Sequence, residues 1–139
     1  MKYGSLILEK KEYVYLKRML NISEYENKFD NKEALKKLKE ELKEAHIVDD
    51  ADMPKDVIRF NSKVTLFFEN QLEKTFQVVA PLDNDVSNSK ISVFAPMGAA
   101  LLGYSEGDTV VWNFTQGKLD LKVIKVEQET MFKNIDVAI

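Results

Sequence analysis

Cysteine is absent from the chain, and histidine occurs once, as His46. Disulfide bonds, cysteine-ligated zinc or iron–sulfur sites and histidine-rich metal sites are therefore excluded. No apolar run approaches the roughly 20 residues of a membrane-spanning helix, and the apolar stretch Leu6–Leu8 is too short for a signal-peptide core. We therefore expect a cytoplasmic protein that has no membrane partner and needs no cofactor.

An excess of positive charge is missing too, since 20 lysines and arginines stand against 23 aspartates and glutamates, for a net charge of −3. Proteins that hold duplex DNA by its phosphates need an excess of basic side chains to release counterions. We therefore expect DNA or RNA to be contacted only indirectly, through a protein partner.

The 139 residues, 45% of them hydrophobic, are enough to bury a core. The sequence is charge-dense and helical in period up to about Asp50, and rich in β-branched and aromatic residues after Pro54. This change predicts an α+β protein with two units, residues 1–50 and residues 51–139.

Two amphipathic helices are predicted in the first unit. Apolar or helix-facing residues recur at 3-4 spacing in two sets, Leu6, Glu9, Tyr13, Leu16 and Leu20, then Leu35, Leu38, Leu42 and Ala45. The polar segment 21–31 predicts a loop between them, Asp30 and Glu33 resemble a capping box, and His46 is expected at the end of the second helix. Such helices pack antiparallel, as a hairpin or short coiled coil.

An antiparallel sheet with one solvent-exposed face is predicted in the second unit. Strand patterns occur at about 57–60, 63–69, 74–80, 90–94, 108–115 and 118–127, and one helix is predicted at about 97–102. Gln116 and Gly117 predict a hairpin turn. Leu119, Leu121 and Val123 alternate with charged residues, so one face of this sheet is expected to meet the helix.

Two motifs carry a family resemblance. Residues 95–103 read APMGAALLG, followed by the Gly107-Asp108 turn, and resemble the Ser-Pro-x-x-x-Ala-Leu-x-Gly segment of the C-terminal domain of the GreA/GreB transcription factors. Residues 52–64 read DMPKDVIRFNSKV and are similar to the matching segment of the Rnk group, the regulators of nucleoside diphosphate kinase within that family. The Ala-Pro form of the first motif also resembles the Rnk group more than the cleavage factors.

The resemblance implies an FKBP-like C-terminal domain, an N-terminal helical hairpin, and binding to RNA polymerase at the rim of its secondary channel. In the cleavage factors a long coiled coil carries carboxylates to the catalytic magnesium ion. Here each helix is expected to have about 12–16 residues, an arm of roughly 18–24 Å, about half as many residues per helix as in those factors. We therefore expect a monomeric, non-enzymatic transcription regulator that occupies the rim without stimulating RNA cleavage.

The resemblance also implies site residues. Ala95, Pro96 and Met97, at the corner between strand and helix, are the predicted polymerase contact, although the small residues after them equally suit close helix-to-sheet packing. Glu24, Glu26 and Asp30 are candidate acidic residues at the hairpin tip, where a solvated turn is favoured over a metal site.

Two alternative functions stay open. One is a cleavage-stimulating elongation factor with a shortened arm. The other is an FKBP-like peptide-binding module, for which six aromatic residues could line a pocket: Trp112, Phe67, Phe68, Phe76, Phe94 and Phe114. Aromatic residues at strand spacing favour a core role instead.

Overall fold

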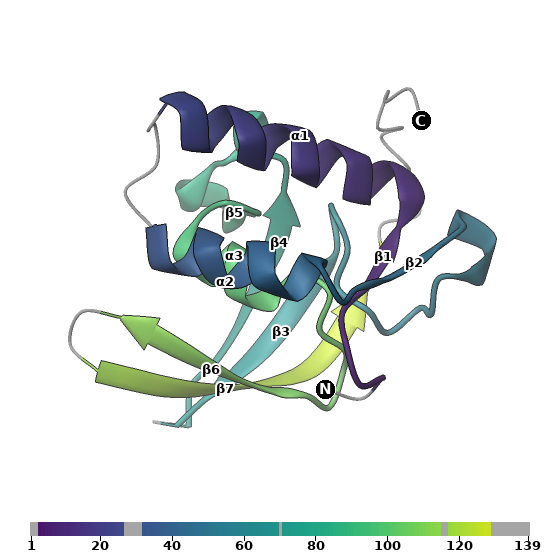
Figure 1. Ribbon diagram of the computed structural model, residues 1–139. Helices are drawn as coiled ribbons and strands as arrows, with labels where there is room; N and C mark the ends of the chain where they lie inside the picture. The colour runs from purple at the N-terminus through teal and green to yellow at the C-terminus, as the bar shows by residue number, and fades with distance from the viewer. Residues whose placement is uncertain (1–2, 27–31, 70, 115–116, 129–139) are drawn as a thin grey trace.

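The computed structural model describes residues 3–26, 32–69, 71–114 and 117–128, in which two helices lie against a sheet domain (Figure 1). The elements in chain order are β1 (Ile7–Glu9), α1 (Lys10–Glu26), α2 (Lys32–Leu42), β2 (His46–Val48), β3 (Lys63–Phe68), β4 (Glu73–Val79), β5 (Lys90–Ser92), α3 (Pro96–Leu101), β6 (Thr109–Phe114) and β7 (Gly117–Glu127). Short 3-10 turns lie at Asp50–Asp52, Pro81–Asp83 and Val86–Asn88.

The main sheet has five strands in the order β5-β4-β3-β7-β6. All neighbours are antiparallel except β4 and β5, which run parallel because the chain loops back between them. The predicted α+β class is confirmed, as are the strands near 63–69, 74–80, 90–94, 108–115 and 118–127 and the helix near 97–102. Gln116 of the predicted hairpin turn lies outside the described residues.

The strand predicted at 57–60 is wrong. This segment forms only an isolated bridge between Val57 and Ser105. The backbone N–H of Phe60 donates to the Glu12 carboxylate instead of a neighbouring strand, and Asn61 then turns the chain with a positive φ of 69°.

A register shift explains the spacing of the buried residues in β7. Leu121 and Val123 alternate as predicted, but the next buried residue is Val126. Between Thr65 and Leu66 of β3 the pairing jumps from Lys125 to Val123, so Ile124 is the extra residue of a β-bulge. The bulge restores Val126 to the buried face after three residues.

The N-terminal segment differs from the predicted helix. Ile7–Glu9 form β1, which pairs in parallel with β2, and the backbone N–H of His46 donates to the carbonyl of Leu6 over 2.8 Å. Leu6, Ile7 and Leu8 are all buried, so they form a continuous apolar run and not a helical stripe. His46 consequently lies in β2, with an exposed side chain, and not in the second helix.

Glu9 caps α1 instead of lying along its apolar face. Its buried carboxylate accepts hydrogen bonds from the backbone N–H groups of Lys11 (3.0 Å) and Glu12 (3.1 Å). These are two of the N–H groups that the first turn of a helix leaves without a partner. The helix begins at Lys10 and runs through the segment predicted as a loop as far as Glu26, since polar residues suit the solvent side of a helix.

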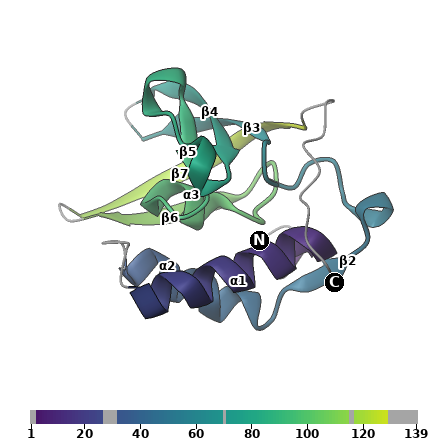
Figure 2. The same ribbon diagram turned by 90° about the horizontal axis from the view of Figure 1, so that it is seen from above.

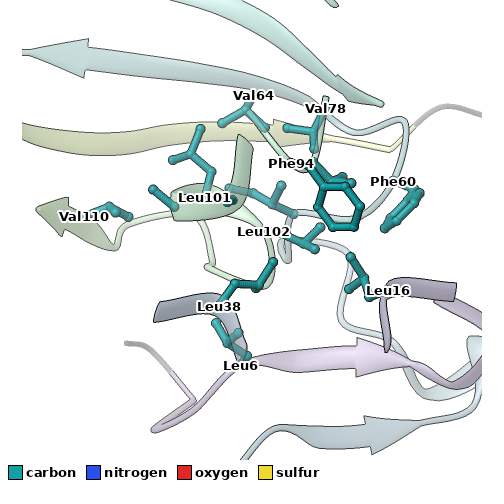
Figure 3. Close-up of a cluster of buried hydrophobic side chains, with 14 of the residues drawn as sticks. Leu6, Leu16, Leu38, Phe60, Val64, Val78, Phe94, Leu101, Leu102 and Val110 are labelled. Atoms are coloured by element: carbon teal, nitrogen blue, oxygen red, sulfur yellow. The ribbon is translucent and has the colours of Figure 1, made fainter. Parts of the chain in front are cut away.

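The predicted leucine seam is buried, and α3 is one of its partners. Leu16, Leu20, Leu35, Leu38 and Leu42 belong to one cluster with Phe94, Leu101 and Leu102. In Figure 3, Leu16 and Leu38 point toward the α3 side chains. The two helices run in opposite directions along the sheet domain, and their described ends do not extend past the β6–β7 hairpin (Figures 1 and 2). Among the helices described, none has both the length and the apolar character of a membrane span.

Truncation of Leu38 tests this packing. Its side chain is 1% exposed, so Leu38→Ala is expected to lower the free energy of unfolding in urea by about 2–5 kcal/mol. Lys36→Ala, a change at an exposed residue two positions away on the same helix, is expected to alter the free energy of unfolding by no more than about 0.5 kcal/mol. Equal small effects would contradict the shared core. Lys37 is less suitable as the control because it contacts Glu41 and the Tyr104 ring.

Candidate functional site

The corner between β5 and α3 brings the predicted contact residues to the surface. Val93 and Phe94, which lead into the corner, are buried. Ala95 and Met97 are half-buried and Pro96 is exposed. The corner is therefore accessible to a partner, while its base belongs to the core.

Ser92 organises this corner through three hydrogen bonds. Its hydroxyl accepts from the N–H of Phe94 (3.0 Å), its carbonyl accepts from the N–H of Ala95 (3.0 Å), and its own N–H donates to Oδ1 of Asn84 (2.9 Å). Ala95 offers no side-chain oxygen to cap α3. Pro96 suits the first helical position because it has no N–H to satisfy.

Gly98 explains part of the motif by packing alone. A Cβ atom at this position would lie 2.0 Å from the backbone carbonyl oxygen of Ser92. The close approach of α3 to β5 therefore requires glycine, and the neighbouring Ala99 and Ala100 are buried as well. Pro96 is left as the exposed residue of the motif, while the half-buried Met97 packs partly against the core.

Gly98→Ala is expected to destabilise the protein by about 3 kcal/mol or more, because backbone atoms and not a flexible side chain occupy the space. Pro96→Ala, two residues away and exposed, is expected to change the free energy of unfolding by less than about 1 kcal/mol. Chemical denaturation of both variants measures the difference. A Gly98→Ala protein as stable as the unmodified chain would mean that α3 does not approach β5 as described.

A buried ion pair joins α1 to the segment leading into the sheet. Oε1 of Glu12 accepts from the N–H of Phe60 (3.0 Å), and Oε2 accepts from Nε of Arg59 (3.0 Å). Nη2 of Arg59 also donates to Asp50 over 2.8 Å. The side chains of Glu12 and Arg59 are 5% and 14% exposed. Nearby, the rings of Tyr15 and Phe60 meet edge to face, with centroids 5.4 Å apart.

Burial raises the pKa of the Glu12 carboxyl above its ordinary value, and the Arg59 guanidinium opposes this shift. A raised acid pKa contributes stability that is fully present below the pKa of the unfolded chain and is lost as the pH rises through the folded value. Arg59 limits that loss. Burial also raises the pKa of Tyr104 to about 12, and Glu41 in α2, which accepts a hydrogen bond from the Tyr104 hydroxyl, contributes to the shift.

Arg59→Met is expected to lower the free energy of unfolding by about 3–5 kcal/mol at neutral pH, because it leaves the buried Glu12 carboxylate without its counterion. The deficit should shrink as the pH falls toward the ordinary carboxyl value of 4.5, where Glu12 takes up a proton. Urea titrations at several pH values, with Lys55→Met as an exposed control, measure this. A deficit that does not change with pH would contradict the role given to Glu12.

The pair was missed in the sequence, although a signal was present. Glu12 precedes Leu16 and Leu20 at four-residue spacing, which places it on the buried face of α1. A carboxylate in an apolar stripe points to a buried partner.

The acidic tip stays a prediction. Glu24 and Glu26 lie in the last turns of α1, but their side chains are outside the described part of the structure, as is all of Asp30, and with it the predicted capping box. Within the described ranges no three histidine, aspartate or glutamate residues gather as a metal site requires.

The aromatic residues fall mainly in or against the core. Phe94 is buried, and Phe68 and Phe76 are partly buried against the same cluster. Phe67 is half-buried and pairs with Lys122 across the strands. The side chains of Trp112 and Phe114 lie outside the described part.

Comparison with known proteins defines the family. Residues 53–128 match the family model described as transcription elongation factor, GreA/GreB, C-terminal. The transcription elongation factors GreA of Brucella canis and of Brucella melitensis biotype 2 are each 30% identical over 98 residues, which cover 70% of this chain and 62% of the relative. The chain thus matches less than two thirds of these relatives' length.

A solved structure has a similar fold over nearly its whole length. The prokaryotic transcription elongation factor GreA/GreB from Nitrosomonas europaea matches with a TM-score of 0.71 and 28% identity, covering 89% of this chain and 98% of that one. The family-model match spans more than half of the chain and defines its class, the family that the model describes as transcription elongation factors. The chain belongs to the GreA/GreB family. Its assignment to the Rnk group within that family stays a prediction.

Proposed function

We propose that the protein binds RNA polymerase at the rim of the secondary channel and regulates transcription without stimulating RNA cleavage. The observation that carries this proposal is the short helical arm, whose leucines are buried against the sheet domain. The protein would act by occupying the polymerase and not as an enzyme. It would work as a monomer in the cytoplasm, and would meet DNA and RNA only through the polymerase.

The length of the arm supports the absence of cleavage. With 17 residues in α1 and 11 in α2, the helices measure about 25 Å and 16 Å at 1.5 Å per residue. A catalytic magnesium ion needs oxygen ligands at about 2.0–2.1 Å, so acidic residues that do not reach the ion contribute little. Glu24, Glu26 and Asp30 would sit at the end of an arm too short to deliver them.

The burial of the arm supports the same conclusion. Five seam leucines would have to leave the core before the helices could project from the sheet domain. Each exposed leucine would cost about 1.5–3 kcal/mol. The arm is therefore expected to stay on the domain when the polymerase is bound.

The corner at Ala95, Pro96 and Met97 is the proposed contact with the polymerase. It is held rigidly by Ser92, it exposes the ring of Pro96, and it lies in the segment that matches the family model. A rigid, partly apolar corner loses little conformational freedom on binding.

Competition with a GreA protein for purified core RNA polymerase tests the proposal. The unmodified chain is expected to displace GreA and to suppress GreA-stimulated cleavage in backtracked complexes, while adding no cleavage itself. Pro96→Asp should weaken the displacement of GreA at least about tenfold. The loss should not come from the fold of the variant, because an acidic residue suits the start of α3. Gln71→Asp, an exposed change in the turn between β3 and β4, is the matched control.

Three other outcomes would contradict the proposal. Cleavage stimulated by the chain alone would favour an elongation factor with a shortened arm. Turnover of a proline peptide without polymerase would favour the FKBP-like module. Displacement equally weakened by Pro96→Asp and Gln71→Asp would remove the corner from the contact.

A further inference from the structure

The loop between β4 and β5 exposes two large apolar side chains. Leu82 is 96% exposed and Val86 is 76% exposed, whereas the other large apolar residues that reach the surface of the described chain are at most 50% exposed. A leucine left in water forgoes the roughly 1.5–3 kcal/mol that burial would contribute. Their exposure gives the isolated chain no packing benefit.

The loop is nevertheless held in a defined shape. The backbones of Asp85 and Lys90 exchange two hydrogen bonds, of 3.0 and 2.9 Å. The Asp85 carboxylate accepts from the side chains of Ser87 and Asn88, and Asn84 accepts from the N–H of Ser92. Leu82 and Val86 are therefore presented by a built turn, and a partner would not have to order it.

The loop lies next to the corner. Because β4 and β5 are parallel, the chain leaves both strands at the same end of the sheet, with Val79 opposite Ser92. The N–H of Val93 donates to the carbonyl of Val79 over 2.8 Å. The turn Pro81–Asp83 and the start of α3 thus lie on one sheet edge, and Figure 2 shows the loop projecting there beside β5 and α3.

Negative charge predominates in the loop, and Lys90, whose backbone is bonded to Asp85, adds one basic group at its end. Residues 81–89 contain Asp83 and Asp85 and no lysine or arginine. A complementary partner therefore offers an apolar socket bordered by basic groups. A second copy of this chain suits the loop poorly, because a two-fold contact would bring the same aspartates of both copies together.

We propose that Leu82 and Val86 anchor this loop in an apolar socket of RNA polymerase that is bordered by lysine or arginine side chains. The proposal rests on the proposed function and extends its contact surface from the corner to the β4–β5 loop. Leu82 is the principal anchor, because it is the most exposed large apolar side chain of the described residues.

A pair of leucine truncations in the full chain tests the proposal. Leu82→Ala is expected to raise the Kd for core RNA polymerase about tenfold or more, and to leave the thermal midpoint unchanged. Leu72→Ala makes the same chemical change at a side chain 50% exposed, in the turn at the far end of β4, and should leave the Kd unchanged. Raised salt should weaken binding of the unmodified chain.

The outcomes separate this proposal from the proposed function. Unchanged binding by Leu82→Ala, with binding lost in Pro96→Asp, would overturn the loop contact and keep the polymerase as partner. Failure of the unmodified chain to bind would overturn both. A dimer in sedimentation that Leu82→Ala dissociates would assign the loop to a second copy and overturn its role with the polymerase.

Discussion

The burial of the helical leucines against α3 is the constraint on which the rest of the structure depends. Leu16, Leu20 and Leu38 do not seal a free-standing coiled coil; they share one core with Leu101 and Leu102. Isolated helices shorter than about 12–15 residues are marginal in water, so a short hairpin gains stability by lying on a domain. The same contact determines where the arm can point, and so links core packing to function.

Polar contacts then fix the orientation that this core leaves open. Apolar packing tolerates small rotations, whereas the Glu12 carboxylate must meet both the Phe60 N–H and the Arg59 guanidinium. A buried carboxylate that lost these partners would be left uncompensated. Glu41 and Tyr104 form a second polar link, from α2 to the turn after α3. The helical unit is thereby held to the sheet domain at two separate places.

Much of the sheet domain could be predicted from the sequence, because alternation is a local signal. Leu121 and Val123 alternate with charged residues, and the stretch from Pro96 to Gly103 carries helix start and stop signals. The N-terminal error has the opposite cause: Leu6 and Glu9 match a helical spacing, but β1 depends on pairing with β2 some forty residues away. Periodicity within one segment cannot encode such pairing. The corner residues were found through the family motif, whereas Leu82 lies in a loop that has no periodicity.

The distribution of free surface follows from these contacts. The seam leucines of the arm are buried in the core, and the described ends of its helices do not pass the β6–β7 hairpin. The edge formed by β4, β5 and α3 differs, since it holds Pro96, Leu82 and Val86 outward on a hydrogen-bonded frame. If binding to the polymerase and delivery of acidic residues to its magnesium ion are separate tasks in this family, a shorter arm removes the second and leaves the first intact. Under the proposed function, a protein built this way would compete for the polymerase by this edge, and its effect on transcription would depend on which other factors it excludes.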